Sequence, residues 1–272
     1  MATAVFFHAH PDDEAIATSG TMMLAKQAGH RVVLVLATRG EQGEPVDGVL
    51  AEAEKLGDRR SDETKRSAEI IGADRVEFLG YEDSGMIDTE SNRNPRCFWQ
   101  ADLSEASERF AKILDSESAD LLTVYDANGG YGHPDHIQVH RVGKRAAEML
   151  GNVKVFESTM NRTKFLDQIE ANIEMLTDGG IELAELEERR KMMREGTFGM
   201  TQDKLTHVVD VSSVIDRKRA AMMTHESQID DDSFFLKLPP EAFVMAFGTE
   251  WFRDAEWKRG SAEFRTDLFV DL

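Results

Sequence analysis

The chain has 272 residues, of which 41% are hydrophobic and 31% charged, and this composition excludes a disordered or fibrous protein. Its 51 acidic against 32 basic residues give a formal net charge of −19, which disfavours nucleic acid and anionic membranes as partners because both repel an acidic surface. The single cysteine, Cys97, excludes an intrachain disulfide and a cysteine-rich zinc site. We recognise no export signal and no apolar run near the roughly 20 residues of a membrane span, so we expect a cytoplasmic protein.

Short apolar runs alternate with stretches of helical period through residues 1–157. The predicted strands are 4–8, 31–37, 75–79, 121–125 and 153–157, and the predicted helices are 14–28, 62–71, 103–114 and 135–150. Such alternation is typical of parallel strands joined by crossover helices. The sequence therefore predicts an α/β fold with a Rossmann-like, mostly parallel sheet, helices on both faces and the strand order 3-2-1-4-5.

Residues 158–272 follow a different pattern, which predicts a helical elaboration packed on the core at 1–157 within the same single domain. Phe165, Ile169, Ile173 and Leu176 are spaced three and four apart, which favours core or subunit contact over a binding groove and leaves room for a homo-oligomer. A strand at 207–211 and a helix at 215–224 are expected to extend the sheet. The aromatic tail is expected to pack back on the main body, because basic residues do not interleave with its rings as single-strand binders require.

A cluster of reactive side chains follows the first predicted strand, in His8-Ala9-His10-Pro11-Asp12-Asp13-Glu14. Three carboxylates at the end of a parallel strand repel one another unless a cation neutralises them. Pro11 suits the first turn of a helix, so that His10 and Asp13 fall on one face while Asp12 points elsewhere. The alternative is that the acidic residues only complement the positive end of the helix.

A second His-Pro-Asp follows the fourth predicted strand, in His133-Pro134-Asp135-His136. In the predicted order the first and fourth strands are neighbours, and ligands bind between their carboxyl ends. The two motifs therefore predict one shared metal site. A catalytic zinc keeps three protein ligands and one open position, and nitrogen and carboxylate donors also suit Fe²⁺ or another divalent ion. The spacing alone allows His10 and Asp13 with either His133 or His136.

The two motifs together resemble those of the zinc-dependent LmbE-like, or PIG-L, de-N-acetylases. The pattern is closest to the GlcNAc-inositol deacetylases and mycothiol conjugate amidases of that family. Gly40-Glu41-Gln42-Gly43, Asp83-Ser84-Gly85-Met86 and His225-Glu226-Ser227-Gln228 add to a resemblance that covers about residues 3–230. The paired motifs are specific for the family and not for one substrate.

The resemblance implies which side chains bind the metal and which perform the chemistry. The implied Zn²⁺ ligands are His10, Asp13 and His136. Asp12 would be the general base for the metal-bound water. His133 would assist the oxyanion or protonate the leaving amine.

The resemblance also implies contacts with the substrate. Tyr131, in the glycine-rich stretch before His133, would lie over the tetrahedral intermediate. Arg60 would contact the substrate, with Arg59 as the neighbouring alternative, and Asp83 would add a polar contact.

Two other histidines have no role in this scheme. His8 faces the same side of its strand as His10 and is expected to be a buried, hydrogen-bonded histidine more often than a support for the metal ligands. His225 is expected on the polar side of a helix end, where capping or an interface role is favoured over catalysis.

These assignments predict a zinc-dependent hydrolase that removes an N-acyl group, expected to be acetyl, from an N-acetylglucosamine-type conjugate through a metal-activated water. The partner is then a small amino-sugar conjugate. Three alternatives stay open: an amidase acting on a thiol conjugate such as a mycothiol conjugate, an acyl group larger than acetyl, and a non-catalytic, metal-stabilised sugar-binding protein.

Overall fold

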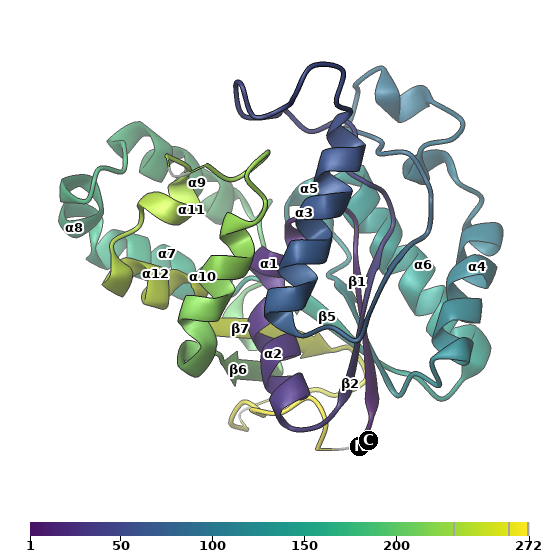
Figure 1. The fold of residues 1–272 in the computed structure, drawn as a ribbon. Helices are drawn as coiled ribbons and strands as arrows, with labels where there is room; N and C mark the ends of the chain where they lie inside the picture. The colour runs from purple at the N-terminus through teal and green to yellow at the C-terminus, as the bar shows by residue number, and fades with distance from the viewer. Residues whose placement is uncertain (231, 261, 271) are drawn as a thin grey trace.

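A seven-stranded sheet runs through the computed structural model, which describes residues 1–230, 232–260, 262–270 and 272 (Figure 1). The strands are β1 Thr3–His8, β2 Arg31–Leu36, β3 Arg75–Phe78, β4 Leu121–Tyr125, β5 Lys154–Thr159, β6 His207–Asp210 and β7 Thr249–Asp254. They lie in the order β3-β2-β1-β4-β5-β7-β6. The first five are parallel, and β7 runs antiparallel between β5 and β6. The predicted order 3-2-1-4-5 is confirmed.

Helices connect the strands and cover the sheet. The α-helices are α1 Asp13–Ala17, α2 Ser19–Gln27, α3 Leu56–Ile71, α4 Leu103–Ser116, α5 Gly129–Gly132, α6 Pro134–Leu150, α7 Arg162–Ala171, α8 Ile173–Asp178, α9 Leu183–Glu195, α10 Ile215–Met223, α11 Phe234–Lys237 and α12 Pro240–Phe247. Short 3₁₀ turns lie at Ser91–Arg93, Phe98–Gln100, Gln202–Lys204 and Ser212–Val214. Within the described ranges, no helix is both long and apolar enough to cross a membrane.

The central strands are buried on both faces, because successive side chains point to opposite sides of a sheet. In β1, Phe6 belongs to a core shared with Met22 of α2 and with α3 and α10. The next side chain, Phe7, stacks on Phe110 of α4 with ring centroids 4.1 Å apart, in a second core that includes Val139 of α6. Figure 1 accordingly shows α4 and α6 on one side of the sheet and α2, α3 and α10 on the other, as predicted.

The chain after β5 adds a group of helices, α7 to α9 with α11 and α12, beside α10 (left in Figure 1). Ile169 and Leu176 are buried in the core there, in agreement with the apolar spacing. Phe243, Phe247 and Phe252 join the same core, which confirms that the aromatic tail packs back on the body. This part of the chain returns to the sheet through β7 and β6.

The prediction of one helix at 14–28 is wrong, because the chain breaks at Thr18, with φ −138°, into α1 and α2. The amides of Gly20 and Thr21 in the first turn of α2 donate to the carboxylate of Glu250, at 2.9 and 2.8 Å. Lys218 Nζ donates to the same carboxylate at 2.5 Å. A buried ion pair from the second half of the chain therefore caps α2.

The sequence does not predict strand β7, which contributes Glu250 to this cap. The buried side chains of β7 are Glu250, Phe252 and Asp254, so the apolar alternation that marks a strand is hidden. Both carboxylates are paired with lysines, Glu250 with Lys218 and Asp254 with Lys154. Because the pairing partners are distant in sequence, local pattern cannot identify this element.

Candidate active site

The two His-Pro-Asp motifs meet where β1 and β4 end. His10 follows β1, and His136 lies in the first turn of α6, which follows β4. Their ring centroids are 5.3 Å apart. Asp13 Oδ2 lies between them, 3.4 Å from His10 Nδ1 and 3.3 Å from His136 Nε2. The structure therefore brings the three predicted metal ligands together.

Carboxylates surround the other ring nitrogen of His10. Its Nε2 lies 3.2 Å from Asp135 Oδ2 and 3.5 Å from Asp83 Oδ1. Asp135, which is fully buried, also accepts hydrogen bonds from the backbone amide and hydroxyl of Ser84. With a metal ion bound, an Nε2–H donated to Asp135 would leave the lone pair of His10 Nδ1, which faces Asp13, free to bind the ion, the usual arrangement for a metal-binding histidine.

His136 has an orphaned nitrogen at the same point. Its Nε2 is buried and makes no hydrogen bond, although Asp13 Oδ2 lies 3.3 Å away. Tyr125 stacks on the imidazole at 4.1 Å between centroids and an interplanar angle of 11°, which fixes the ring. A buried nitrogen without a partner is costly, and a metal ion is one partner that would satisfy it.

The charges around His10 are unbalanced. Burial lowers the pKa of His10, but the carboxylates of Asp83, Asp13 and Asp135 outweigh it and hold that pKa well above its usual range. Burial raises the pKa of Asp13, but His136 and His10 outweigh it and hold it well below the usual range. The arrangement thus keeps several carboxylates ionised in a buried place, and a divalent cation would compensate them.

Asp12, the predicted base, has a strained backbone beside the ligands. Its φ is 103°, a left-handed value that costs a residue with a side chain about 1–3 kcal/mol. Burial raises the pKa of Asp12 to about 6, and Arg60, whose Nη2 lies 3.3 Å from Oδ2, opposes that rise. A carboxylate with this pKa is ionised at neutral pH and remains basic enough to accept a proton.

Glu14 and His225 hold this strained turn from behind. Glu14 Oε2 accepts from the backbone N–H of Asp12 at 3.0 Å, and Oε1 lies 2.7 Å from His225 Nε2 and 2.6 Å from the hydroxyl of Ser67. Glu14 and His225 are both fully buried. The expected position of His225 on the polar side of a helix end is therefore wrong, since it is enclosed behind the predicted base.

Arg60 lies in α3, which begins at Leu56 and not at the predicted residue 62. Its side chain is 4% exposed and donates to the carbonyls of Pro11 and Gly40, at 2.5 and 2.8 Å. Gly40 has φ +67°, and a Cβ there would lie 2.3 Å from Arg60 Nη1. Only glycine therefore leaves room for the arginine, which lies against Asp12. Arg59 instead pairs with Glu63 at 3.2 Å, Glu226 at 3.5 Å and Glu54 at 3.7 Å.

His133 caps the N-terminus of α6. Its Nδ1 accepts the backbone N–H of Asp135 at 3.1 Å, so the proton of the neutral ring is on Nε2. Burial and the neighbouring His10 and His136 lower the pKa of His133 to about 3. His133 is thus a neutral hydrogen-bond donor at physiological pH.

Tyr131 lies on the short helix α5, over the ring of His136 at 5.0 Å between centroids. Its loop is held by Asp126, whose carboxylate accepts from the N–H of Gly130 at 3.1 Å and from the hydroxyl of Thr159 at 2.5 Å. Gly199 N–H donates to the carbonyl of Gly130 at 2.8 Å. Burial raises the pKa of Tyr131, so its hydroxyl stays protonated.

His8 is a buried, hydrogen-bonded histidine, as expected. Its Nδ1 lies 3.0 Å from the hydroxyl of Tyr125 and its Nε2 lies 2.8 Å from Thr18 Oγ1. Through Tyr125 it supports the ring that stacks on His136. The sequence motifs contain Asp135 and Glu14, but Tyr125 carries no local signal because it is the last residue of an ordinary buried strand.

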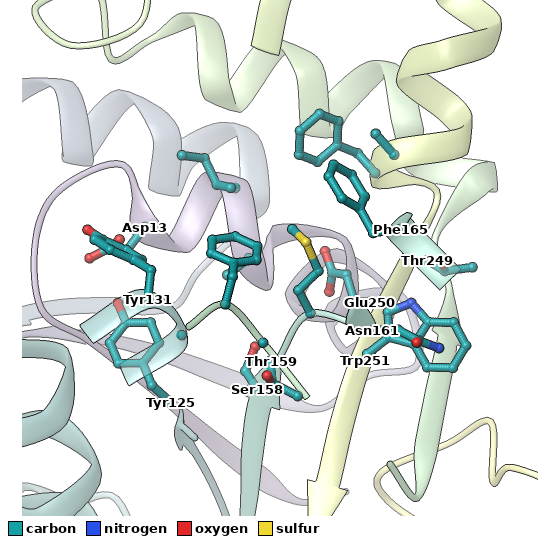
Figure 2. A pocket seen from close by; sticks show the side chains of 18 of the residues that line it. Asp13, Tyr125, Tyr131, Ser158, Thr159, Asn161, Phe165, Thr249, Glu250 and Trp251 are labelled. Carbon is teal, nitrogen blue, oxygen red and sulfur yellow. The ribbon is translucent and has the colours of Figure 1, made fainter. Parts of the chain in front are cut away.

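A cavity of about 430 Å³ opens from these residues toward the second half of the chain. Figure 2 shows Asp13 and Tyr131 at one end and Phe165, Thr249 and Trp251 at the other. Its lining is rich in aromatic and methionine side chains: Met160, Phe165, Phe198, Phe234, Phe235, Met245, Phe247 and Trp251. The sequence favours core or subunit contact over a binding groove for the stripe that starts at Phe165; Ile169 and Leu176 do lie in the core, but Phe165 also lines this cavity.

The family model for GlcNAc-PI de-N-acetylase (PIG-L) matches residues 5–147, which contain both motifs. The chain belongs to the PIG-L family. It is also 37% identical, over 97% of this chain and 93% of the relative, to the 1D-myo-inositol 2-acetamido-2-deoxy-alpha-D-glucopyranoside deacetylase of Acidothermus cellulolyticus. The predicted family of de-N-acetylases, enzymes that hydrolyse an amide bond, is confirmed.

Solved structures share the PIG-L fold of this chain at low identity. The N,N'-diacetylchitobiose deacetylase of Pyrococcus horikoshii is 20% identical, with a TM-score of 0.58 over 99% of this chain and 88% of its own. The 4-carboxy-2-hydroxymuconate hydratase of Pseudomonas putida is 18% identical, with a TM-score of 0.60 over 97% of this chain and 100% of its own. These enzymes are named for different reactions, so the fold alone does not determine the chemistry.

Proposed function

We propose that this protein hydrolyses the acetamide of an N-acetylglucosamine conjugate such as a GlcNAc-inositol, with Zn²⁺ held by His10, Asp13 and His136. The main support for this metal site is the position of Asp13 Oδ2, which lies 3.4 Å from His10 Nδ1 and 3.3 Å from His136 Nε2, a nitrogen with no hydrogen-bond partner. Ligands at about 2.0–2.1 Å from a tetrahedral Zn²⁺ lie about 3.3–3.4 Å apart. The substrate is taken from the names of relatives at 37% and 33% identity.

His133 is the weaker candidate for the third ligand, although one ring nitrogen from each of His10, His133 and His136 lies within 4.8 Å of the other two. Its Nδ1 is occupied by the N–H of Asp135, which leaves a proton and not a lone pair on Nε2. His136 Nε2 has no such partner. This contrast supports His136 as the ligand and His133 as a donor.

A divalent ion at this site would polarise the amide carbonyl and lower the pKa of a bound water toward neutrality. Asp12 accepts a proton from the attacking water, because its carboxylate is ionised above about pH 6 and lies next to Asp13. His133 donates its Nε2–H to the oxygen on which negative charge develops. Tyr131 covers the site and contributes a protonated hydroxyl.

Asp83 and Arg60 are proposed to act on the substrate side of the site. Asp83 is buried beside His10 Nε2, where the sugar nitrogen would leave. The guanidinium of Arg60 donates to two backbone carbonyls and pairs with Asp12. Its main effect is therefore to position the proposed base and to compensate its negative charge. Direct contact of Arg60 with the sugar stays a prediction.

A panel assay tests this function. Protein loaded with Zn²⁺ is incubated with N-acetylglucosamine, its oligomers, GlcNAc-inositol and a thiol conjugate of the same sugar, and the released amine is measured. We expect GlcNAc-inositol to be cleaved best. Bound zinc without release of amine from any of them would contradict the proposal and favour a sugar-binding protein.

A further inference from the structure

We infer that the apolar cavity beside Asp12 and Asp13 is an acyl-binding site, and that this enzyme prefers N-acyl amino sugars whose acyl group is a straight chain of about six to ten carbons. This inference rests on the proposed amide hydrolysis. It replaces acetyl with a longer acyl chain as the preferred group that the enzyme removes. The oxygen of water bonds to the acyl carbon and the C–N bond breaks. The nitrogen keeps the electron pair of that bond and receives the two protons of the water, so that a fatty carboxylate and the sugar ammonium are released.

The size of the cavity exceeds what an acetyl group needs. Its 430 Å³ falls in the range of about 300–1,000 Å³ that buries drug-sized ligands. Asp12, Asp13, Tyr131 and His136 all line it, so it is continuous with the site of chemistry. An acetyl methyl would occupy only the end that Figure 2 shows at Asp13 and Tyr131.

Polar side chains also line the cavity, Asn161, Gln168 and Thr249 among them, but the larger part of the lining is apolar, which suits a hydrocarbon better than a sugar. Phe165 on α7, Phe234 and Phe235 on α11, and Phe247 on α12 face the same space. Burying a sugar hydroxyl without a hydrogen-bond partner is unfavourable, whereas burying each methylene is favourable.

The direction of the cavity assigns it to the acyl side of the amide. A trans secondary amide places its acyl and nitrogen substituents on opposite sides of the C–N bond. The carbonyl oxygen of a trans amide lies on the same side as the nitrogen substituent. His133, proposed to act at that oxygen, and Asp83, proposed to lie where the amine leaves, do not line the cavity, and neither does Arg60. An amide whose oxygen faces His133 and whose nitrogen faces Asp83 therefore directs its acyl chain toward Phe165 and Trp251.

A chain-length series of N-acyl glucosaminyl-inositols, from acetyl to decanoyl, tests the inference with the Zn²⁺-loaded enzyme. Each methylene that becomes buried can raise kcat/KM by up to about fourfold, so we expect octanoyl to exceed acetyl by at least about tenfold. Ala246→Trp, which fills the cavity, should lower the octanoyl-to-acetyl ratio about tenfold. Phe165→Ser, which makes the lining polar, is a second variant for the case that Ala246→Trp folds poorly. It should lower the same ratio.

Asp167→Ala is the matched control, because Asp167 lies on the exposed side of α7 and does not line the cavity. It should leave the octanoyl-to-acetyl ratio unchanged. Efficient release of acetate with kcat/KM falling steadily as the chain lengthens would overturn the inference and leave the proposed function intact. Failure to cleave any member of the series, acetyl included, would overturn both.

Discussion

At the scale of single residues, the proposed base is held in a conformation that it would not adopt alone. Asp12 has φ 103°, and its backbone N–H is fixed by Glu14, which His225 and Ser67 hold in turn. Arg60 compensates the charge of its carboxylate. These contacts hold Asp12 beside the proposed metal ligands, an arrangement that would separate metal binding from proton transfer.

Asp12→Asn should retain the metal and lose turnover by about 10²–10⁴, because asparagine tolerates positive φ but cannot accept the proton of water. Metal content by mass spectrometry and amine release measured on the same sample check this. Asp62→Asn, on the exposed face of α3, is the matched control and should behave like the native enzyme. Loss of metal from Asp12→Asn would make Asp12 a ligand.

The acid limb of the pH profile should depend on Arg60. Activity needs the ionised carboxylate of Asp12, so kcat/KM should fall as the pH drops below its pKa, which is about 6 and lower with a cation bound. Arg60→Gln removes a charge that lowers this pKa, so the limb should move up by about one pH unit. Arg60→Lys, which keeps the charge, should move it less. An unshifted limb in Arg60→Gln would show that Arg60 does not act on the base.

His133 should act as a neutral donor and not as a titrating acid. Its pKa of about 3 means that no limb near neutral pH belongs to it. His133→Phe should lower kcat by about 10²–10³ and leave the shape of the pH profile unchanged, while His133→Gln, which keeps an N–H, should retain more activity. Disappearance of a limb near neutrality in His133→Phe would instead indicate an imidazolium acid.

At the scale of elements, the two halves of the chain are joined at the start of α2. The break at Thr18 exposes the first amides of that helix, and Glu250 of β7 accepts from Gly20 and Thr21 while pairing with Lys218. Glu250 and Lys218 also line the cavity. The contact of Glu250 with α2 and Lys218 therefore lies at the break between α1 and α2 and connects that break to β7. The same two side chains form one side of the proposed acyl site.

Glu250→Ala should lower the free energy of unfolding by about 3–5 kcal/mol, because it leaves Lys218 buried without a counter-charge. Urea denaturation followed by circular dichroism measures this. The double variant with Lys218→Met should recover part of the loss. Glu256→Ala, which removes an exposed carboxylate 3.6 Å from Lys154, should change stability by less than about 1 kcal/mol. Equal effects of Glu250→Ala and Glu256→Ala would show that the buried pair does not stabilise the junction.

At the scale of the whole molecule, the sequence predicts what depends on local pattern and on the rules of parallel sheets. Apolar runs identify β1 to β5, and their order places the motifs at His10 and His136 side by side. The rest depends on pairs that are distant in sequence. The pairing of Glu250 with Lys218 puts a charged residue at a buried position of β7, so the sequence of this strand lacks an apolar pattern. The pairing of Glu14 with His225 allows burial of a histidine that local pattern places on a polar surface.

The sequence does not predict the cavity. Away from Asp12, Asp13, Tyr131 and His136, its aromatic lining comes chiefly from α7, from Phe198 and from the segment that follows residue 230, where the aromatic spacing looks like ordinary core. Only their arrangement around the carboxyl ends of the strands shows that some of these rings face a space. We therefore propose that the second half of the chain determines which glycan and acyl group are accepted, while the first half carries the proposed catalytic residues.

We propose that His10, Asp13 and His136 hold one divalent ion. Anomalous diffraction at the zinc edge, from crystals of the Zn²⁺-loaded protein, locates that ion. We expect a single strong peak within bonding distance of His10 Nδ1, Asp13 Oδ2 and His136 Nε2, with Asp12 beside it and unbonded. A peak elsewhere, or one that excludes any of these three side chains, would contradict it.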